Sequence, residues 1–117
     1  MIKATGIDIV KIRRIKEATE RWGERFLSRV FTEDELRYCL SKKSCHESLA
    51  VRFAAKEAFI KALGKRIDLR LIEVKNEPSG RPYLNIKSPV ANGRRFHLSL
   101  SHDDEYAVAV VVMEELQ

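Results

Sequence analysis

The sequence predicts an α+β fold in which an amino-terminal strand and several helices precede an antiparallel β-meander. Three segments support this class: residues 2–10 are apolar and β-branched, residues 11–64 carry apolar side chains at helical spacing, and residues 71–113 consist of short apolar runs between turns. Strands and helices separated in this way along the chain favour α+β over a doubly wound parallel sheet, in which they would alternate.

The first predicted strand contains one charged side chain, Asp8, flanked by two isoleucines. Because side chains alternate across a strand, Asp8 should share a face with Ile2, Ala4 and Val10. A helix is predicted to follow and to end or kink at Gly23. Its apolar positions recur at helical spacing: Ile12, Ile15, Ala18 and Trp22.

Two further predicted helices begin with a capping pattern in which each side chain satisfies a free backbone amide. Thr32 with Glu35 precedes a short helix, and Ser44 with Glu47 precedes the longest one. The long helix is rich in alanine and ends at Gly64, which is a typical carboxy-terminal stop.

The remaining chain is predicted to form strands at residues 71–74, 83–86, 96–101 and 106–113, separated by turn-rich segments. Apolar and polar side chains alternate over 96–101, so this strand should have one polar face. The last segment, YAVAVVVM, is almost continuously apolar, which predicts a central strand.

Composition restricts the class of protein. With 117 residues, 44% of them hydrophobic and 33% charged, the chain is expected to fold as a single globular domain, residues 1–117. No apolar run approaches the roughly 20 residues that span a bilayer, so no membrane partner is expected. Cys39 and Cys45 are too few for a disulfide framework and lack zinc-site spacing, which favours a cytoplasmic location. The net charge of +5 predicts an anionic partner of unspecified kind.

Glu57 is the most informative position, because the long helix around it is apolar on most sides and should be largely buried. A buried carboxylate needs a partner. Spacing alone favours Lys61, four residues later in the stabilising Glu-before-Lys order. Asp8 poses the same problem in its apolar strand, and Mg²⁺ is commonly held by one or two carboxylates together with substrate phosphates. A shared cation at Asp8 and Glu57, with Lys61 and Arg52 beside the phosphates, is therefore the second hypothesis.

Two polar groups could bind other anions. Ser101 and His102 end the polar strand face and could donate hydrogen bonds to a phosphate, although such residues more often form the solvated face of a sheet. Arg14, Arg21 and Arg25 fall within a narrow arc if the first helix stays regular. This basic stripe could face an acidic partner or simply water.

Five segments of the chain together match one family. They are GIDIV at 6–10, FTEDELRYC at 31–39, RFAAKEAFIKALG at 52–64, SGRPYL at 79–84 and HLSLSHDDEYAVAVV at 97–111. In this order and spacing they resemble the holo-acyl-carrier-protein synthases, the small class of 4′-phosphopantetheinyl transferases. The chain departs from the family at Ala4, where relatives often have glycine, and at Lys65 and Arg66, which replace a glycine-containing stretch in a shortened segment.

The resemblance implies an enzyme of fatty acid biosynthesis with the 4′-phosphopantetheinyl transferase fold, assembled as a homotrimer with sites between subunits. It would transfer 4′-phosphopantetheine from coenzyme A to a serine of apo-acyl carrier protein and release 3′,5′-ADP. Asp8 and Glu57 would bind Mg²⁺, and Lys61 would contact the phosphates, which makes these three the catalytic residues. Glu57 is also the preferred acceptor of the serine proton, directly or through a water.

The resemblance also implies roles in substrate binding. Arg52, Ser101 and His102 would line the coenzyme A site together with Lys61. The acidic carrier protein would dock on the basic residues of the first helix, Arg14, Arg21 and Arg25.

Two other classes of function stay open. A nucleic-acid-binding module is favoured by the positive charge, but the sequence has no zinc-finger spacing and no aromatic RNA-binding signature, so a nucleic acid partner is not expected. A non-catalytic carrier-binding protein would bind the carrier and leave it unmodified.

Overall fold

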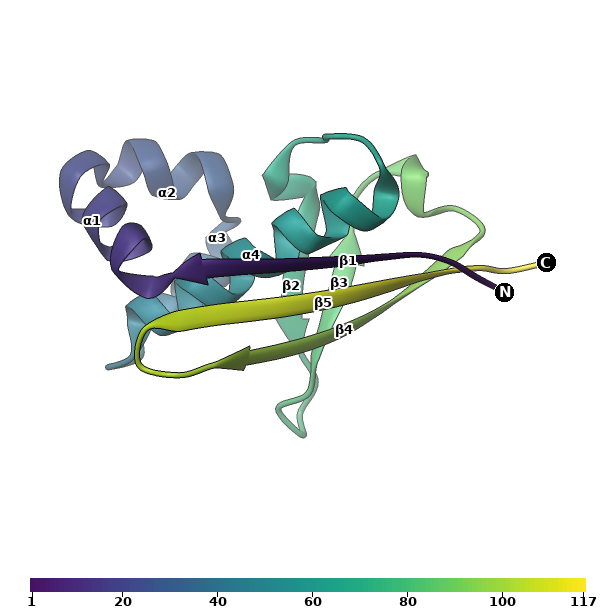
Figure 1. Ribbon diagram of the computed structural model, residues 1–117. Coiled ribbons are helices and arrows are strands. Elements are labelled where there is room, and N and C mark those ends of the chain that lie inside the picture. The colour runs from purple at the N-terminus through teal and green to yellow at the C-terminus, as the bar shows by residue number, and fades with distance from the viewer.

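A computed structural model describes residues 1–117 and confirms the α+β class, with two antiparallel sheets and four α-helices (Figure 1). In chain order the elements are β1 Ile2–Lys11, α1 Ile12–Trp22, α2 Glu24–Val30, α3 Glu33–Leu40, α4 Cys45–Leu63, β2 Ile72–Asn76, β3 Pro82–Ile86, β4 Arg94–His102 and β5 Tyr106–Glu115. Two 3₁₀ turns, at Leu69–Leu71 and Pro89–Ala91, lie in the connections before β2 and before β4.

The antiparallel strands form two sheets and not one continuous meander. β1, β5 and β4 make a three-stranded sheet with β5 in the centre, as the apolar sequence of β5 predicts, whereas β2 and β3 pair separately. The connection from β3 to β4 contains Pro89, which lacks a backbone donor, and Gly93 with a positive φ of 75°. This connection interrupts the ladder, and the free edge of β5 is taken by β1 from the other end of the chain.

The long helix α4 packs against the inner face of the three-stranded sheet, behind it in Figure 1. Its small side chains at this contact are fully or almost fully buried: Ala54, Ala55, Ala58 and Ala62. Gly6 of β1 faces the helix so closely that a Cβ atom there would lie 1.9 Å from the carbonyl oxygen of Ala58. Backbone therefore packs against backbone where β1 crosses α4.

The helix ends agree with the sequence in three of four places. Gly23 separates α1 from α2 with φ 51°, Gly64 closes α4 in the left-handed conformation, and Thr32 forms the full capping box with Glu35. The expected side-chain cap at Ser44 is wrong. Ser44 precedes α4 with φ −89° and ψ 43°, outside the extended region that an N-cap side chain normally requires, and its hydroxyl makes no cap bond.

A buried ionic network, which was not predicted from the sequence, joins α3, α4 and β2. The ammonium of Lys56 lies 2.7 Å from Glu35 Oε1 and donates to the carbonyl oxygens of Leu69 and Ile72. Glu35 also accepts from the backbone N–H of Val74 at 2.9 Å. Both charged side chains are fully buried, and their hydrogen-bond partners offset the desolvation of the two charges. The network links Lys56, which directly precedes Glu57 on α4, to α3 and β2.

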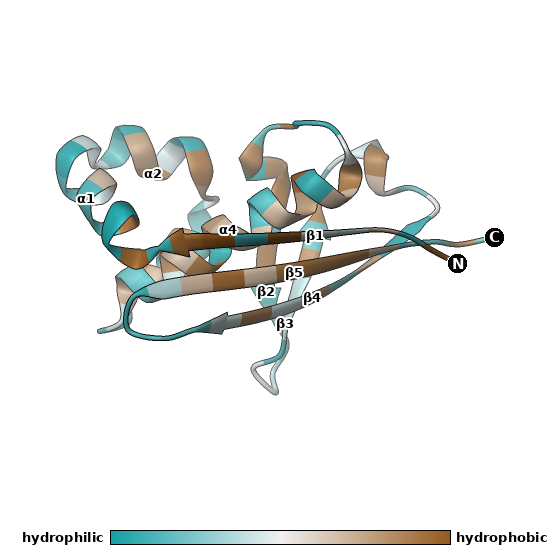
Figure 2. Cartoon of the chain, in the orientation of Figure 1, coloured by the Kyte–Doolittle hydropathy of each residue, from teal (hydrophilic) through white to brown (hydrophobic).

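The outer face of the three-stranded sheet carries no helix in Figure 1 and is apolar along β1 and β5 in Figure 2. Ile7 and Ile9 point to this side and are 59% and 62% exposed. Asp8 points the other way, so its isoleucine neighbours do not bury it. The two chain ends lie together at one end of the sheet, where the N–H of Glu115 donates to the carbonyl oxygen of Met1. None of the helices is both long and apolar enough to cross a membrane.

Candidate active site

Asp8 and Glu57 are brought together by the close contact between β1 and α4. Asp8 lies two residues after Gly6 on the same face of β1, and Glu57 adjoins Ala58 on the helix. Their side chains are 18% and 20% exposed, so both carboxylates lie in a half-buried position that solvent and solutes can reach. The sequence offered this juxtaposition as its second hypothesis, from two carboxylates in apolar segments, and the family resemblance implied it.

Lys61 belongs to this group but does not pair with Glu57. Its ammonium donates to the carbonyl oxygen of Ile7 at 2.8 Å and to Asp8 Oδ1 at 3.3 Å. The i,i+4 ion pair favoured by spacing is therefore wrong. β1 offers Lys61 a carbonyl oxygen and a carboxylate, and the Lys61 ammonium bonds to these two groups and not to Glu57.

The partner of Glu57 is Arg66, which sequence reasoning treated only as a departure from the family. Arg66 Nη2 lies 2.9 Å from Oε1 and 3.3 Å from Oε2 of Glu57. The available signal was the order of residues: the stop at Gly64 followed by two basic side chains allows the chain to turn back toward the helix.

Burial raises the pKa of the Asp8 carboxyl above its usual range, and the neighbouring charge of Glu57 adds to the increase. The hydrogen bond and charge of Lys61 oppose it, as does the charge of Arg14. The two carboxylates therefore repel each other, and the charges of Lys61, Arg14 and Arg66 offset this repulsion.

The donor set fits a hard cation that takes only part of its ligands from the protein. The structure contains no group of three or more His, Cys, Asp or Glu side chains that could hold a metal by themselves. Two carboxylates are the usual protein contribution at a Mg²⁺ site that is completed by substrate phosphates and water. Asp8 and Glu57 meet this requirement.

Arg52 is built into the core beside this site and does not project from it. Only 4% of the residue is exposed. Its guanidinium donates to Asn76 Oδ1 at 2.7 Å and to the Ser48 carbonyl oxygen at 3.2 Å, and it lies 4.5 Å from the Tyr38 ring centroid. Its Nε is buried with no hydrogen-bond partner. The prediction that Arg52 lines a nucleotide site would require these contacts to rearrange.

Ser101 and His102 lie apart from the carboxylates and on opposite faces of the sheet. Ser101 points to the outer face with Val108 beside it, whereas His102 approaches Glu47 of α4 at 4.0 Å. The expectation that both end one polar face is therefore wrong for His102, because neighbouring residues alternate. In the register of β4, His102 pairs with Ala107, two positions along β5 from Ala109, which faces Asp8.

The three arginines of the predicted stripe are divided by Gly23. Arg14 and Arg21 lie on α1 and Arg25 on α2, so they do not form one helix face. The guanidinium carbons of Arg21 and Arg25 instead lie over the indole of Trp22, at 4.9 and 5.9 Å from the ring centroid. Arg14 is near enough to Asp8 to lower its pKa.

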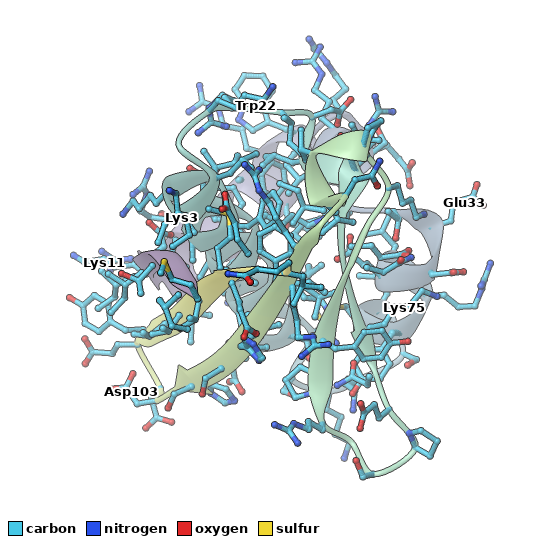
Figure 3. All side chains as sticks on the ribbon, turned by 90° about the vertical axis from the view of Figure 1, so that its right-hand side faces the viewer. Lys3, Lys11, Trp22, Glu33, Lys75 and Asp103 are labelled. Atoms are coloured by element: carbon cyan, nitrogen blue, oxygen red, sulfur yellow. The ribbon has the colours of Figure 1, made fainter.

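A surface depression lies beside Arg25. Trp22, Arg25, Phe26, Arg29 and Val30 line a depression of about 360 Å³ on α1 and α2. Trp22 is 49% exposed and projects from the molecule at the edge opposite Asp103 in Figure 3. Trp22 was predicted on the apolar side of a helix, so this surface was not predicted from the sequence.

Comparison with known proteins identifies the class to which this small α+β domain belongs. The chain belongs to the 4′-phosphopantetheinyl transferase superfamily, whose family model matches residues 4–111. Within it, the chain is a member of the holo-[acyl-carrier-protein] synthase family. It is 47% identical over 124 residues to the holo-[acyl-carrier-protein] synthase of Halothermothrix orenii, covering 98% of this chain and 99% of that relative.

Two further relatives agree with this assignment. The synthase of Chloroherpeton thalassium is 51% identical over 116 residues, covering 93% of this chain and 95% of its own length. The crystal structure of the Bacillus anthracis synthase in complex with CoA (3′,5′-ADP) superposes with a TM-score of 0.87 and 36% identity, covering 100% of this chain and 99% of that one.

Proposed function

We propose that this chain transfers the 4′-phosphopantetheine group of coenzyme A to a serine of apo-acyl carrier protein, releasing 3′,5′-ADP and supporting fatty acid biosynthesis. The observation that carries this proposal is the convergence of Asp8 and Glu57 from separate elements of a fold whose Bacillus anthracis member was crystallised with CoA (3′,5′-ADP). Its curated relatives are named for synthesis of the holo carrier protein.

Mg²⁺ is the proposed cofactor. Asp8 and Glu57 would hold it with their carboxylate oxygens, and the pyrophosphate of coenzyme A would complete the ligand set. When bound, the cation would offset negative charge that develops on the pyrophosphate during the transfer.

In this proposal, Lys61 and Glu57 have different roles. Lys61 holds a positive charge at the edge of the site, and its bond to the Ile7 carbonyl oxygen keeps the ammonium in place. Glu57 accepts the proton of the attacking serine, directly or through a water. Alignment of the serine with the β-phosphorus accounts for much of the remaining rate enhancement.

A homotrimer would complete the coenzyme A site. In this proposal Arg52, Ser101 and His102 line the coenzyme A site. Ser101 lies on the outer face of the sheet and Asp8 on the inner face, so a site that uses both needs a neighbouring copy. The uncovered outer face of the sheet supports association, because isoleucines there are more than half exposed.

The carrier protein would dock on the basic surface of α1 and α2. Arg14, Arg21 and Arg25 supply the positive charge for an acidic partner, and the exposed indole of Trp22 offers an apolar anchor between two of them.

Two broader assignments accompany this function. Residues 1–117 are proposed to act as one transferase domain, which the single cluster of 21 buried core residues supports. A cytoplasmic location is proposed from the family and from two cysteines that are both free.

The direct experiment is mass spectrometry of an apo-acyl carrier protein incubated with this protein, coenzyme A and Mg²⁺, beside an EDTA control. We expect a gain of one phosphopantetheine unit that is absent with EDTA and absent with Glu57→Gln. No gain with several competent carriers would reject the transferase proposal, and near-normal turnover of Glu57→Gln would remove Glu57 from the mechanism.

A further inference from the structure

The loop after α4 places a cation directly on one of the two proposed metal ligands. Gly64 ends the helix with φ 84°, and the chain then reverses. Arg66 thereby reaches Glu57, nine residues earlier, with one nitrogen at 2.9 Å from Oε1 and 3.3 Å from Oε2. A single donor atom therefore bridges the two oxygens that a divalent cation would also use.

The two members of this ion pair differ in how firmly they are held. Glu57 lies in the body of α4 and its side chain is 20% exposed, whereas Arg66 lies outside any helix or strand and its side chain is 63% exposed. Glu57 is the only hydrogen-bond partner of the Arg66 side chain. An ion pair with one exposed member is weak, so Arg66 can leave without disturbing other contacts.

The other basic residues near the carboxylates are not free in this sense. Lys61 is also bonded to the backbone of β1, and Arg52 is buried against Asn76 and the carbonyl oxygen of Ser48. Arg14 acts on Asp8 through its charge but makes no hydrogen bond to either carboxylate, so it has no bonded partner to exchange. Arg66 is therefore the cation best able to exchange one anionic partner for another. A guanidinium is suited to this exchange, because its planar fork matches both carboxylate and phosphate geometry.

We propose that Arg66 is a displaceable counter-ion of Glu57: it competes with the divalent cation for this carboxylate and, once displaced, pairs with the phosphates of coenzyme A. The inference rests on the proposed function for the identity of both ligands. Binding of the cation to Glu57 releases Arg66 for the phosphates, and binding of coenzyme A to Arg66 frees Glu57 for the cation. Each ligand therefore increases the affinity for the other.

The test compares Arg66→Gln with Lys65→Gln. Both variants remove one positive charge from the same loop, but Lys65 has no side-chain bond to Glu57. Binding of Mn²⁺, used as a probe for Mg²⁺, is measured by electron paramagnetic resonance without coenzyme A. Coenzyme A binding is measured by calorimetry in the presence of Mg²⁺. Glu57→Gln is included in the Mn²⁺ experiment.

Relative to Lys65→Gln, we expect Arg66→Gln to bind Mn²⁺ roughly two- to fivefold more tightly and coenzyme A more weakly by a similar factor, the range of an exposed ion pair. Shifts of opposite sign are the signature of an exchanged partner, since simple loss of charge would affect both variants alike. Equal Mn²⁺ affinities, or equal coenzyme A affinities, would overturn the inference.

Failure of the Arg66 role and failure of the proposed cation site give different results. If Glu57→Gln loses Mn²⁺ binding while Arg66→Gln and Lys65→Gln are indistinguishable, only the role of Arg66 is wrong. If Glu57→Gln binds Mn²⁺ as the unmodified protein does, the cation site of the proposed function is wrong, and the inference falls with it.

Discussion

Substitution of Gly6 by alanine should separate the two carboxylates of the candidate site. The added Cβ would lie 1.9 Å from the Ala58 carbonyl oxygen and 2.8 Å from the Ala62 nitrogen. Ordinary van der Waals contact begins at 3.4 Å, so moving from 1.9 Å to 3.4 Å requires β1 and α4 to part by about 1.5 Å. The obstacle is helix backbone, which cannot rotate aside as a side chain can.

The displacement has a cost in stability and a cost in activity. Overpacking of this kind destabilises by about 1–3 kcal/mol, and we expect the upper end of that range because both partners are backbone. Asp8 moves with the strand while Glu57 stays with the helix. A misplacement of about 1 Å can reduce catalysis roughly a hundredfold, so turnover should fall by that order.

Urea unfolding and the carrier mass assay measure the two effects, and Gly93→Ala is the control. Gly93 has φ 75° but open space around it, so its alanine variant should lose about 1–2 kcal/mol from the left-handed backbone alone and keep normal turnover. If Gly6→Ala unfolds within about 1 kcal/mol of the unmodified protein and transfers at a normal rate, close packing of β1 on α4 does not position the site.

Four other outcomes are expected. Lys56→Met leaves the buried Glu35 without its cation and should lower the free energy of unfolding by about 3–5 kcal/mol in urea titrations; a loss below 1 kcal/mol would contradict a buried pair. Burial alone would raise the pKa of Glu73, but hydrogen bonds and nearby lysines lower it on balance, so its stabilisation is present above the ordinary value of 4.5 and disappears as the pH falls through the lowered folded value. The stability difference between the unmodified protein and Glu73→Gln should therefore shrink between pH 5 and pH 3, and a constant difference would refute this. Val110→Arg on the outer face of β5 should shift the protein toward monomer in analytical ultracentrifugation and reduce turnover, whereas an unchanged sedimentation profile would argue against this face as the interface. Arg21→Glu should raise the KM for the carrier with little change in kcat, more strongly at low salt, and an effect independent of salt would reject charge-based docking.

Local features of this protein were predictable because their causes lie within a few residues. Thr32 and Glu35 are three residues apart and satisfy each other's backbone amides in the structure as the sequence suggests. Gly64 ends α4 because glycine adopts the left-handed conformation without strain. The apolar sequence of β5 predicted a central strand, and β5 lies between β1 and β4 in the sheet.

Several predictions failed because the competing contacts come from elsewhere in the chain. Lys61 was expected to pair with Glu57, but β1 offers it the Ile7 carbonyl oxygen and Asp8. Ser44 was expected to cap α4, but the turn before the helix holds it in a different conformation. In both cases the local preference is worth about 1 kcal/mol or less and yields to the packing of whole elements.

The sequence by itself determined the class of fold, the main helix stops, the central strand and, through five matching segments, the family of the chain. Only the tertiary structure decided which charges meet. Asp8 and Glu57 are 49 positions apart and converge because Gly6 lets one backbone approach another, and Arg66 reaches Glu57 because the loop after α4 turns back. Such pairings depend on chain closure and on the packing of distant elements, and no periodicity along the chain records them.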